Sequence, residues 1–171
     1  NLIDLLADRG ALQEALAQAQ HSLRLEPRHP ALYNSLGNVL QRLKRYDEAV
    51  AIQNYLRTNF TYQIDAGGAP DGRDIVDYFL FESKVGRCDH YASSMAVMLR
   101  MLGVPTRIVT GLAPVSFDSE MGGYVYRGRN AHAWVEVYFP GFGWVPFEPT
   151  PGRGMPGAEE YTGVREEQDE A

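Results

Sequence analysis

The sequence predicts an α+β fold, in which helices come first along the chain and an antiparallel sheet follows. Residues 1–50 repeat with a period of 34, which is typical of stacked helix pairs. Residues 88–102 place apolar side chains at helical spacing, and strand-like segments separated by Gly and Pro follow from Thr106 onward. A chain of 171 residues with 44% hydrophobic residues suffices for one ordinary domain and a short helical segment.

Two partial units make up the N-terminal repeat. Residues 12–15 (LQEA) return as residues 46–49 (YDEA), and 49 − 15 gives the period of 34. Pro27 ends the first unit, and Tyr33 lies near the start of the second. The pattern is similar to that of tetratricopeptide repeats, whose helix pairs meet at small residues and end at a proline. About one and a half units are too few for a stable solenoid, so we expect them to pack on the next domain, to continue in further repeats, or to be partly unfolded.

A change of pattern at Thr58 marks the end of this helical segment. Residues 65–72 are rich in Gly, Asp and Pro, and they predict a loop. After this loop, Asp71 or Asp74 can cap a short helix over residues 75–82.

The helix expected over residues 88–102 carries Met95, Leu99 and Leu102 on one face and stops before Gly103. Segments rich in alternating and β-branched residues, bounded by turn residues, then predict a sheet. The expected strands cover residues 106–112, 124–127, 131–139 and 144–148, with a loop over 114–123 and a turn over 140–143. Short strands joined by tight turns pair in the antiparallel sense.

Composition and charge narrow the classes of function. The net charge of −6 argues against nucleic acid as a partner. Residues 153–171 hold six acidic residues and two arginines, which predicts a flexible, solvated acidic tail. No apolar run approaches the length of a membrane span and no signal peptide is visible. We therefore expect either a cytoplasmic protein or a soluble extracytoplasmic part of a larger membrane protein.

Cys88 is the only cysteine of the chain, so no internal disulfide can form. It stands in the segment GRCDHYA (residues 86–92), at the start of the apolar helix. The positive end of the helix dipole favours the thiolate, which is the nucleophilic form of a cysteine. A lone cysteine is most often an inert core residue, but this placement predicts a nucleophile.

His132 and Glu148 are candidate partners of that thiol. His132 shares one face of its expected strand with Glu136, but Glu136 lies about 13 Å further along the strand. In an antiparallel hairpin, paired positions have a constant sum, and the midpoint of 132 and 148 is 140, inside the expected turn. This register places Glu148 beside His132. The three residues then predict a triad in which Cys88 attacks a carbonyl carbon, His132 ionises the thiol and protonates the leaving amine, and Glu148 orients the imidazole.

Five segments make the chain similar to the bacterial transglutaminase-like superfamily. They are GRCDHYAS (86–93), RMLGVPTR (100–107), TG (110–111), HAWVE (132–136) and GWVPFEPT (143–150). The resemblance covers roughly residues 50–152 and implies a papain-like α+β core with the triad Cys88, His132 and Glu148. The third member is usually Asp in this family, so the longer Glu148 requires the strand or the histidine to adjust.

The resemblance divides the chain into helical repeats over residues 1–50, a catalytic domain over 51–152 and the acidic tail over 153–171. It implies an enzyme that cleaves or transfers amide acyl groups of a protein or peptide substrate through a thioester on Cys88. Hydrolysis by a cysteine protease or amidase is the first expectation, and protein-glutamine gamma-glutamyltransferase activity is the alternative. A third hypothesis is a non-catalytic scaffold in which the helical repeats bind a peptide or protein partner.

We expect no cofactor and no metal. A zinc site formed by Cys88, His90 and His132 would lack compact spacing and a second cysteine, and His90 is expected to pack locally. The acidic loop residues that could suggest calcium, which some animal relatives require, are Asp65, Asp71, Asp74, Asp118 and Glu120. Their spacing matches no calcium-binding loop. The backbone N–H of Cys88 is the expected oxyanion donor, with Tyr62 and Gln63 as candidates for a second one.

Overall fold

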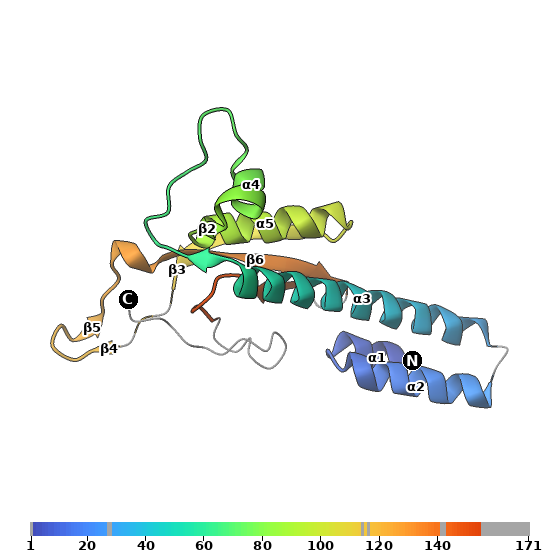
Figure 1. Ribbon diagram of the computed structural model, residues 1–171. Coiled ribbons are helices and arrows are strands. Elements are labelled where there is room, and N and C mark those ends of the chain that lie inside the picture. The colour runs from blue at the N-terminus through green and yellow to red at the C-terminus, as the bar shows by residue number, and fades with distance from the viewer. Residues whose placement is uncertain (1, 27–28, 114, 116, 141–142, 155–171) are drawn as a thin grey trace. The chain divides into compact units, whose positions relative to one another are not determined.

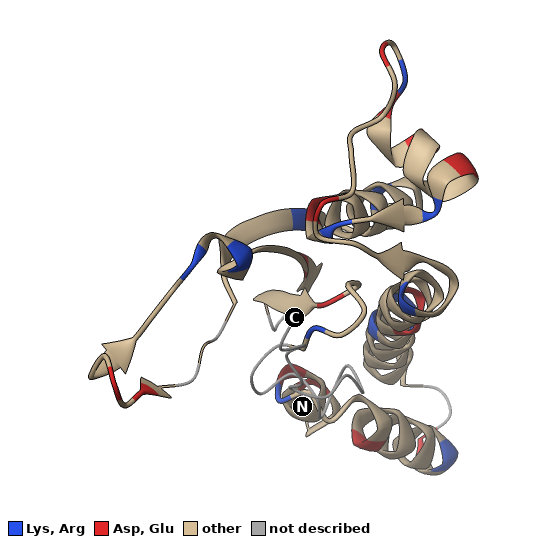
Figure 2. Cartoon of the chain, turned by 60° about the vertical axis from the view of Figure 1, so that its left-hand side comes forward, with Lys and Arg blue, Asp and Glu red and all other residues tan. Residues whose placement is uncertain are grey.

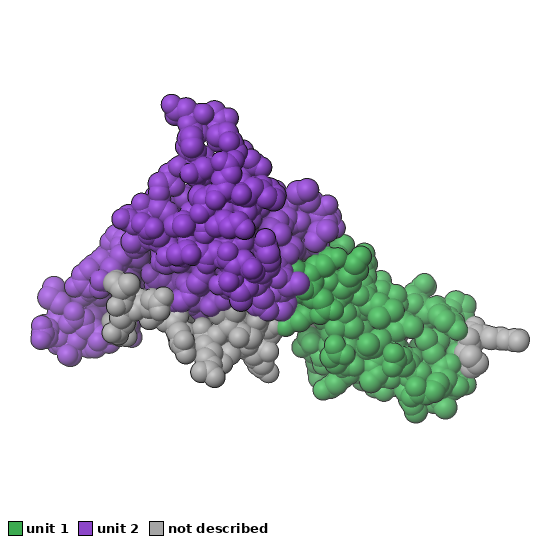
Figure 3. Space-filling view, viewed as in Figure 1, with its two compact units in different colours: residues 1–49, 138–145 green, residues 50–137, 146–171 purple. Residues whose placement is uncertain are grey.

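The computed structural model of the chain describes residues 2–26, 29–113, 115, 117–140 and 143–154 (Figure 1). Helices and a sheet both contribute, and the predicted α+β class is confirmed. The chain divides into two compact units, which Figure 3 shows in different colours. Unit 1 consists of residues 1–49 and 138–145, and unit 2 consists of residues 50–137 and 146–171. All three candidate site residues belong to unit 2.

Unit 1 contains the helices α1 (Leu2–Asp8) and α2 (Leu12–Leu25) and the first part of α3 (Pro30–Asn59). Gly10, with a φ of 88°, lies in the turn between α1 and α2, where an L side chain would be strained. The buried core consists of small and branched side chains: Ile3, Ala7, Ala15, Ala19 and Val39. Alanine side chains end at Cβ, so the helices can pack closely at these positions.

Helix α3 differs from the second repeat unit that the sequence predicts. That unit needs a turn between two helices, but α3 continues without a break from Pro30 to Asn59. The turn of the first unit lies at Gly10. One period of 34 later, the equivalent position is Lys44, a good helix former, so the helix continues there. An ion pair also joins α1 to α3, because Arg42 Nη1 lies 3.0 Å from Asp8 Oδ1. The tetratricopeptide interpretation stays a prediction.

In unit 2, the residues after α3 form the short helix α4 (Ile75–Tyr78), the π-helix η1 (Phe79–Ser83) and the helix α5 (Cys88–Met101). Of the two predicted caps, Asp74 caps α4, and its Oδ1 accepts hydrogen bonds from two backbone N–H groups at 2.9 and 3.0 Å. The single helix predicted over residues 75–82 was therefore only partly correct. The α-helical part ends at Tyr78, and the chain continues from Phe79 as a π-helix. Lys84 ends the π-helix in the left-handed conformation, with a φ of 51°.

Aromatic rings hold the first turns of α5 in the core of unit 2. Phe79 is fully buried, and its ring centroid lies 4.8 Å from that of Phe60 and 4.9 Å from that of Tyr91. Met95 and Leu99, one and two turns further along α5, are also fully buried. This packing fixes the N-terminal end of α5, which begins with Cys88.

The main sheet contains β3 (Thr106–Leu112), β6 (Ala131–Phe139) and β7 (Gly143–Phe147), in the order β3-β6-β7. The bounds predicted for β3 and β6 are confirmed, and β7 begins and ends one residue earlier than predicted. Two small sheets were not predicted. The strands β1 (Thr61–Tyr62) and β2 (Val85–Gly86) pair in parallel. Strand β4 (Phe117–Asp118), which lies in the predicted loop, pairs with β5 (Gly123–Tyr124), which begins one residue before the predicted strand. The strand predicted over residues 124–127 is wrong beyond Tyr124, because residues 125–127 have no regular structure, and a 3-10 turn, η2 (Gly128–Asn130), then leads into β6.

Strand β6 separates an apolar face from a polar one. Ala133, Val135, Val137 and Phe139 are all buried, whereas His132 and Trp134 lie on the opposite face. Gly111 of β3 pairs with His132, and a Cβ on Gly111 would come within 2.9 Å of the Trp134 ring. Glycine at this position therefore leaves the room that the indole beside His132 occupies.

Charges on the described helices are mixed in sign, and Figure 2 shows Lys and Arg (blue) interspersed with Asp and Glu (red). Several exposed pairs are formed, including Arg87 with Asp89 and Arg107 with Glu136. Exposed pairs of this kind contribute little to the free energy of unfolding, because water and salt screen them. Within the described residues, no helix is both long enough and apolar enough to cross a membrane.

Candidate active site

Cys88 is the first residue of α5, as the sequence predicts. The residue before it, Arg87, is extended and makes no side-chain cap to the helix, and its carbonyl oxygen accepts from the backbone N–H groups of His90 and Tyr91 at 3.0 and 3.3 Å. Arg87 instead donates two hydrogen bonds of 3.0 Å to Asp89. Gly86 lies so close to His90 and Phe79 that a Cβ on it would approach both within 2.7 Å. Glycine at this position therefore allows β2 to pass close to α5 just before the thiol.

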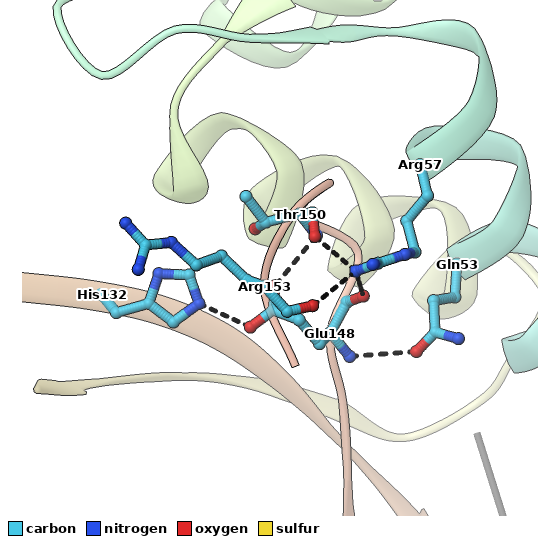
Figure 4. A network of polar contacts seen from close by, with 6 residues as sticks. All are labelled: Gln53, Arg57, His132, Glu148, Thr150 and Arg153. Atoms are coloured by element: carbon cyan, nitrogen blue, oxygen red, sulfur yellow. Dashed lines mark hydrogen bonds and ion pairs between the residues drawn. The ribbon is translucent and has the colours of Figure 1, made fainter. Parts of the chain in front are cut away.

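The structure brings the side chains of His132 and Glu148 together, although Glu148 lies one residue after the end of β7. His132 Nε2 lies 2.5 Å from Glu148 Oε2, and the two residues are 7% and 1% exposed (Figure 4). The Cys88 side chain lines the same cleft as His132 and is close enough to raise the pKa of the ring, whose second nitrogen, Nδ1, is not engaged by Glu148. The imidazole thus lies between the thiol and the carboxylate.

Every polar group of Glu148 has a partner. While Oε2 faces His132, Oε1 accepts a hydrogen bond of 2.9 Å from the backbone N–H of Thr150. The backbone N–H of Glu148 donates to Gln53 Oε1 at 3.0 Å, and its carbonyl oxygen accepts from Arg57 at 3.0 Å. The carboxylate of Glu148 therefore bridges the His132 ring and the backbone N–H of Thr150, and the glutamate side chain is long enough to reach both.

The pKa of His132 results from opposing effects. Burial alone would lower it, but the hydrogen bonds to Cys88 and Glu148 and the charges of these two groups outweigh burial and raise the pKa from 6.5 to about 9. The imidazole therefore holds a proton at neutral pH. A protonated imidazole beside a cysteine is the arrangement that supports a thiolate–imidazolium pair.

A cleft of about 610 Å³ opens over the thiol and the imidazole. Cys88 and His132 line it together with Tyr62 and Ile64 from the segment that includes β1 and with Thr110–Leu112 of β3. The cleft is large enough for a side chain or a short peptide segment. Both reacting groups of the predicted triad are therefore accessible to a substrate, whereas Glu148 is buried behind His132.

Residues 36–149 match the sequence profile of the transglutaminase-like superfamily. The chain belongs to this superfamily. Among its relatives, the uncharacterized protein YebA of Bacillus subtilis is 44% identical over 63% of this chain. A Pseudomonas aeruginosa protein named protein-glutamine gamma-glutamyltransferase is 35% identical over 60% of this chain. The chain spans 15% of the length of each of these two relatives.

A solved structure with a similar fold supports this architecture. The periplasmic domain of TgpA from Pseudomonas aeruginosa, bound to ethylmercury, is 26% identical and superposes with a TM-score of 0.54. That match covers 92% of this chain and 48% of the TgpA domain. The predicted fold, a transglutaminase-like core with an N-terminal helical segment, is confirmed.

Two other residues that the sequence offered as site candidates, Glu136 and His90, have different partners in the structure. Glu136 pairs with Arg107 across the β3–β6 ladder, at 2.6 Å from its Nε, and so is engaged away from the imidazole of His132. His90 is buried against Phe79, as expected for a packing residue, and burial lowers its pKa despite the neighbouring Asp89. In the described part of the chain, no three His, Cys, Asp or Glu side chains are grouped as metal ligands.

The two candidates for a second oxyanion donor differ in the structure. The backbone N–H of Gln63 donates to the Gly86 carbonyl at 2.9 Å, and its side chain donates to Asp65 at 2.8 Å. Its donors are therefore engaged away from the thiol. Tyr62 lines the cleft, and its N–H points away from β2 because successive residues of a strand alternate in direction. Tyr62 is the better candidate of the two.

Sequence reasoning missed Gln53 and Arg57, which contact Glu148 from α3 (Figure 4). One signal was available. Gln53 falls among the buried positions Ala49, Ile52 and Leu56 of the same helix, and it is itself fully buried. A polar side chain within an apolar stripe indicates a buried hydrogen-bond partner, although not which one.

Proposed function

We propose that the chain carries the active site of a cysteine-dependent enzyme that cleaves or transfers amide acyl groups of proteins or peptides. The observation that carries this proposal is the hydrogen bond of one imidazole to Glu148, together with the position of that imidazole beside Cys88 in the lining of an open cleft. The same cysteine, histidine and acid could serve a hydrolase or a transferase, since both begin with the same acyl-enzyme.

The first half of the proposed reaction forms a thioester. The thiolate of Cys88 attacks the carbonyl carbon of the amide, and a C–S bond forms. His132 gives its proton to the amide nitrogen, and the C–N bond breaks to release ammonia or an amine. The Cys88 backbone N–H, at the start of α5, stabilises the oxyanion, and Glu148 keeps the imidazole oriented.

In the second half, His132 takes a proton from water or from a primary amine, which attacks the thioester and breaks the C–S bond. Water gives a carboxylic acid, and an amine gives a new amide. Hydrolysis was the first expectation, but the name of the 35% identical relative, protein-glutamine gamma-glutamyltransferase, favours transfer from a glutamine side chain to an amine. Cross-linking is therefore the second candidate function.

An assay with a glutamine-containing peptide separates these reactions. Ammonia release without added amine shows hydrolysis, and incorporation of a fluorescent primary amine shows transfer. The matched control is Cys88→Ala, which should do neither. If a broad panel of glutamine peptides and other amides is left intact, and Cys88 forms no thioester with activated acyl esters, the non-catalytic scaffold becomes the better hypothesis.

The pH dependence is a prediction of this mechanism. We expect kcat/KM to fall as the pH rises through about 9, because His132 then loses the proton that it gives to the leaving amine. The same shift affects stability. Since the pKa of folded His132 lies above the ordinary 6.5, its contribution to stability is fully present below about pH 6.5 and is lost as the pH rises through about 9.

To test this prediction, kcat/KM and the thermal midpoint of unfolding are each measured as a function of pH. His132→Gln is the control, because it should remove the stability difference between pH 6 and pH 9.5 that comes from this residue. An alkaline limb of kcat/KM near pH 7 would contradict the raised pKa.

The division into segments 1–50, 51–152 and 153–171 also stays a proposal, as does a protein partner for the helical segment. Limited proteolysis with mass determination of the fragments tests both boundaries. Most of the proposed acidic tail lies outside the described residues.

A further inference from the structure

The segment after β7 lacks regular structure of its own, although it carries the buried carboxylate. Glu148 follows Phe147, the last residue of β7, and the chain then turns at Gly152, which has a φ of 68°. The backbone groups of such a buried segment need partners from elsewhere in the protein. Figure 4 shows two side chains of α3, Gln53 and Arg57, reaching toward this segment.

Arg57 binds the segment at three points through one nitrogen. Its Nη1 donates to the carbonyl oxygens of Glu148 at 3.0 Å and Arg153 at 2.8 Å, and also to that of Thr150. One guanidinium nitrogen carries two hydrogens, so three carbonyl oxygens must converge around it. The charge of the guanidinium strengthens each of these bonds. The curvature of residues 148–153 is therefore set by where α3 places Arg57.

Gln53 adds a fourth contact, one turn earlier on α3. Its Oε1 accepts the backbone N–H of Glu148, and the side chain is fully buried. The backbone of Glu148 is thus held from both its N–H and its carbonyl oxygen by α3. Its side chain is held by Thr150 and His132.

Resting on the proposed function, we infer that Gln53 and Arg57 are positioning residues, which hold Glu148 so that its carboxylate orients the imidazole of His132. Neither side chain is among those that line the cleft. Their effect on the reaction passes through Glu148, whose carboxylate is 2.5 Å from the ring. A displacement of about 1 Å at such a contact can lower a rate by about 100-fold, although the reacting groups are unchanged.

The titratable groups that face His132 are Cys88 from α5 and Glu148 from the segment after β7, and Arg87 and Asp89 line the same cleft. Loosening Glu148 weakens one of the two contacts that raise the pKa of His132 to about 9. A residue that only stabilises the fold would not shift this pKa. The titration of His132 therefore distinguishes positioning from general stabilisation.

The test compares Arg57→Met with Arg57→Lys and with a matched control, Arg100→Met. Arg100 also binds a backbone carbonyl, that of Thr106, at 3.1 and 2.9 Å, but it lies away from Glu148. The readouts are the NMR titration of the His132 imidazole, kcat and KM, and the thermal midpoint. Lysine keeps the positive charge and has three donors on one nitrogen, so it should restore most of what methionine removes.

We expect Arg57→Met to lower kcat by about 10- to 100-fold with little change in KM, and to move the His132 titration from about 9 toward 6.5. Arg100→Met should lower the thermal midpoint and leave the titration in place. An unchanged titration in folded Arg57→Met, or an equal shift in Arg100→Met, would overturn the inference.

If Arg57→Met does not fold, Gln53→Leu carries the same test, because it removes the contact with the Glu148 N–H and leaves Arg57 in place. It should shift the titration in the same direction, and a folded Gln53→Leu with the titration of the parent would overturn the inference. The NMR readout does not depend on turnover. Failure of the proposed function would appear separately, as the absence of turnover in the parent chain or as full activity of His132→Gln.

Discussion

Cys88→Ser is expected to abolish turnover while leaving the fold intact. Serine has nearly the same size, and Cys88 is the only cysteine, so no other thiol can replace it. A hydroxyl at this position is not ionised by the imidazole at neutral pH as a thiol can be, so we expect kcat to fall by at least about 10⁴-fold. The measurement is ammonia release from a glutamine peptide by the parent and the variant at equal concentration.

The control for this substitution is the thermal midpoint, which should be close to that of the parent because the residue is only partly buried. Activity near that of the parent would remove Cys88 from the mechanism. Loss of activity together with loss of the folded state would require Cys88→Ala before any conclusion about the nucleophile.

Glu148→Gln is expected to have the second-largest effect. The amide has the length of the glutamate and can still accept from the Thr150 N–H, but it has no charge to balance the imidazolium of His132. Loss of the orienting acid in a triad lowers kcat by about 10²- to 10⁴-fold, with a smaller change in KM. Steady-state kinetics with the parent substrate measure both constants, and an unchanged kcat would exclude Glu148 from the mechanism.

Glu148→Asp is the matched variant, because it keeps the charge and shortens the side chain by one methylene. Aspartate can no longer bridge His132 Nε2 and the Thr150 N–H without a backbone shift, since both contacts are short, at 2.5 and 2.9 Å. We expect an activity between those of the parent and of Glu148→Gln. An aspartate variant as active as the parent would show that the turn at Thr150 does not depend on glutamate.

Much of the fold was predictable where local patterns are long. The bounds of β3 and β6 followed from their residue types and the turn residues around them, and the start of α5 followed from its apolar face. Short elements were missed, because two-residue strands such as β1 and β2 show no period. Their pairing depends on contacts between segments more than 20 residues apart in the sequence.

The continuity of α3 shows a different limit. The repeat pattern around Ala15 and Ala49 is real, but a similar pattern does not require a similar turn. Glycine adopts the positive φ of a turn at low cost in free energy, so the chain can turn at Gly10. Lysine has a high helix propensity, which favours a continuous helix at Lys44. The period therefore predicted which positions are buried better than it predicted where the helix would break.

For the candidate site, the three residues of the proposed triad were predictable from the sequence, whereas the two α3 residues that hold Glu148 were not. Cys88, His132 and Glu148 each lie in a recognisable segment, and the hairpin register places two of them together. Gln53 and Arg57 are 95 and 91 residues from Glu148 in the sequence, and on a helix they look like ordinary polar residues. Only the packing of α3 beside the segment after β7 reveals their contacts.

The most direct test of the central claim is the rate at which iodoacetamide alkylates Cys88 at pH 7, in the parent and in His132→Ala. Whole-protein mass spectrometry reports this rate unambiguously, because the chain has a single cysteine. If His132 holds the thiol ionised, the parent should react at least about tenfold faster than the variant, since a free thiol is only a few per cent ionised at this pH. Equal, slow rates in both proteins would contradict the thiolate–imidazolium pair and would favour the non-catalytic scaffold.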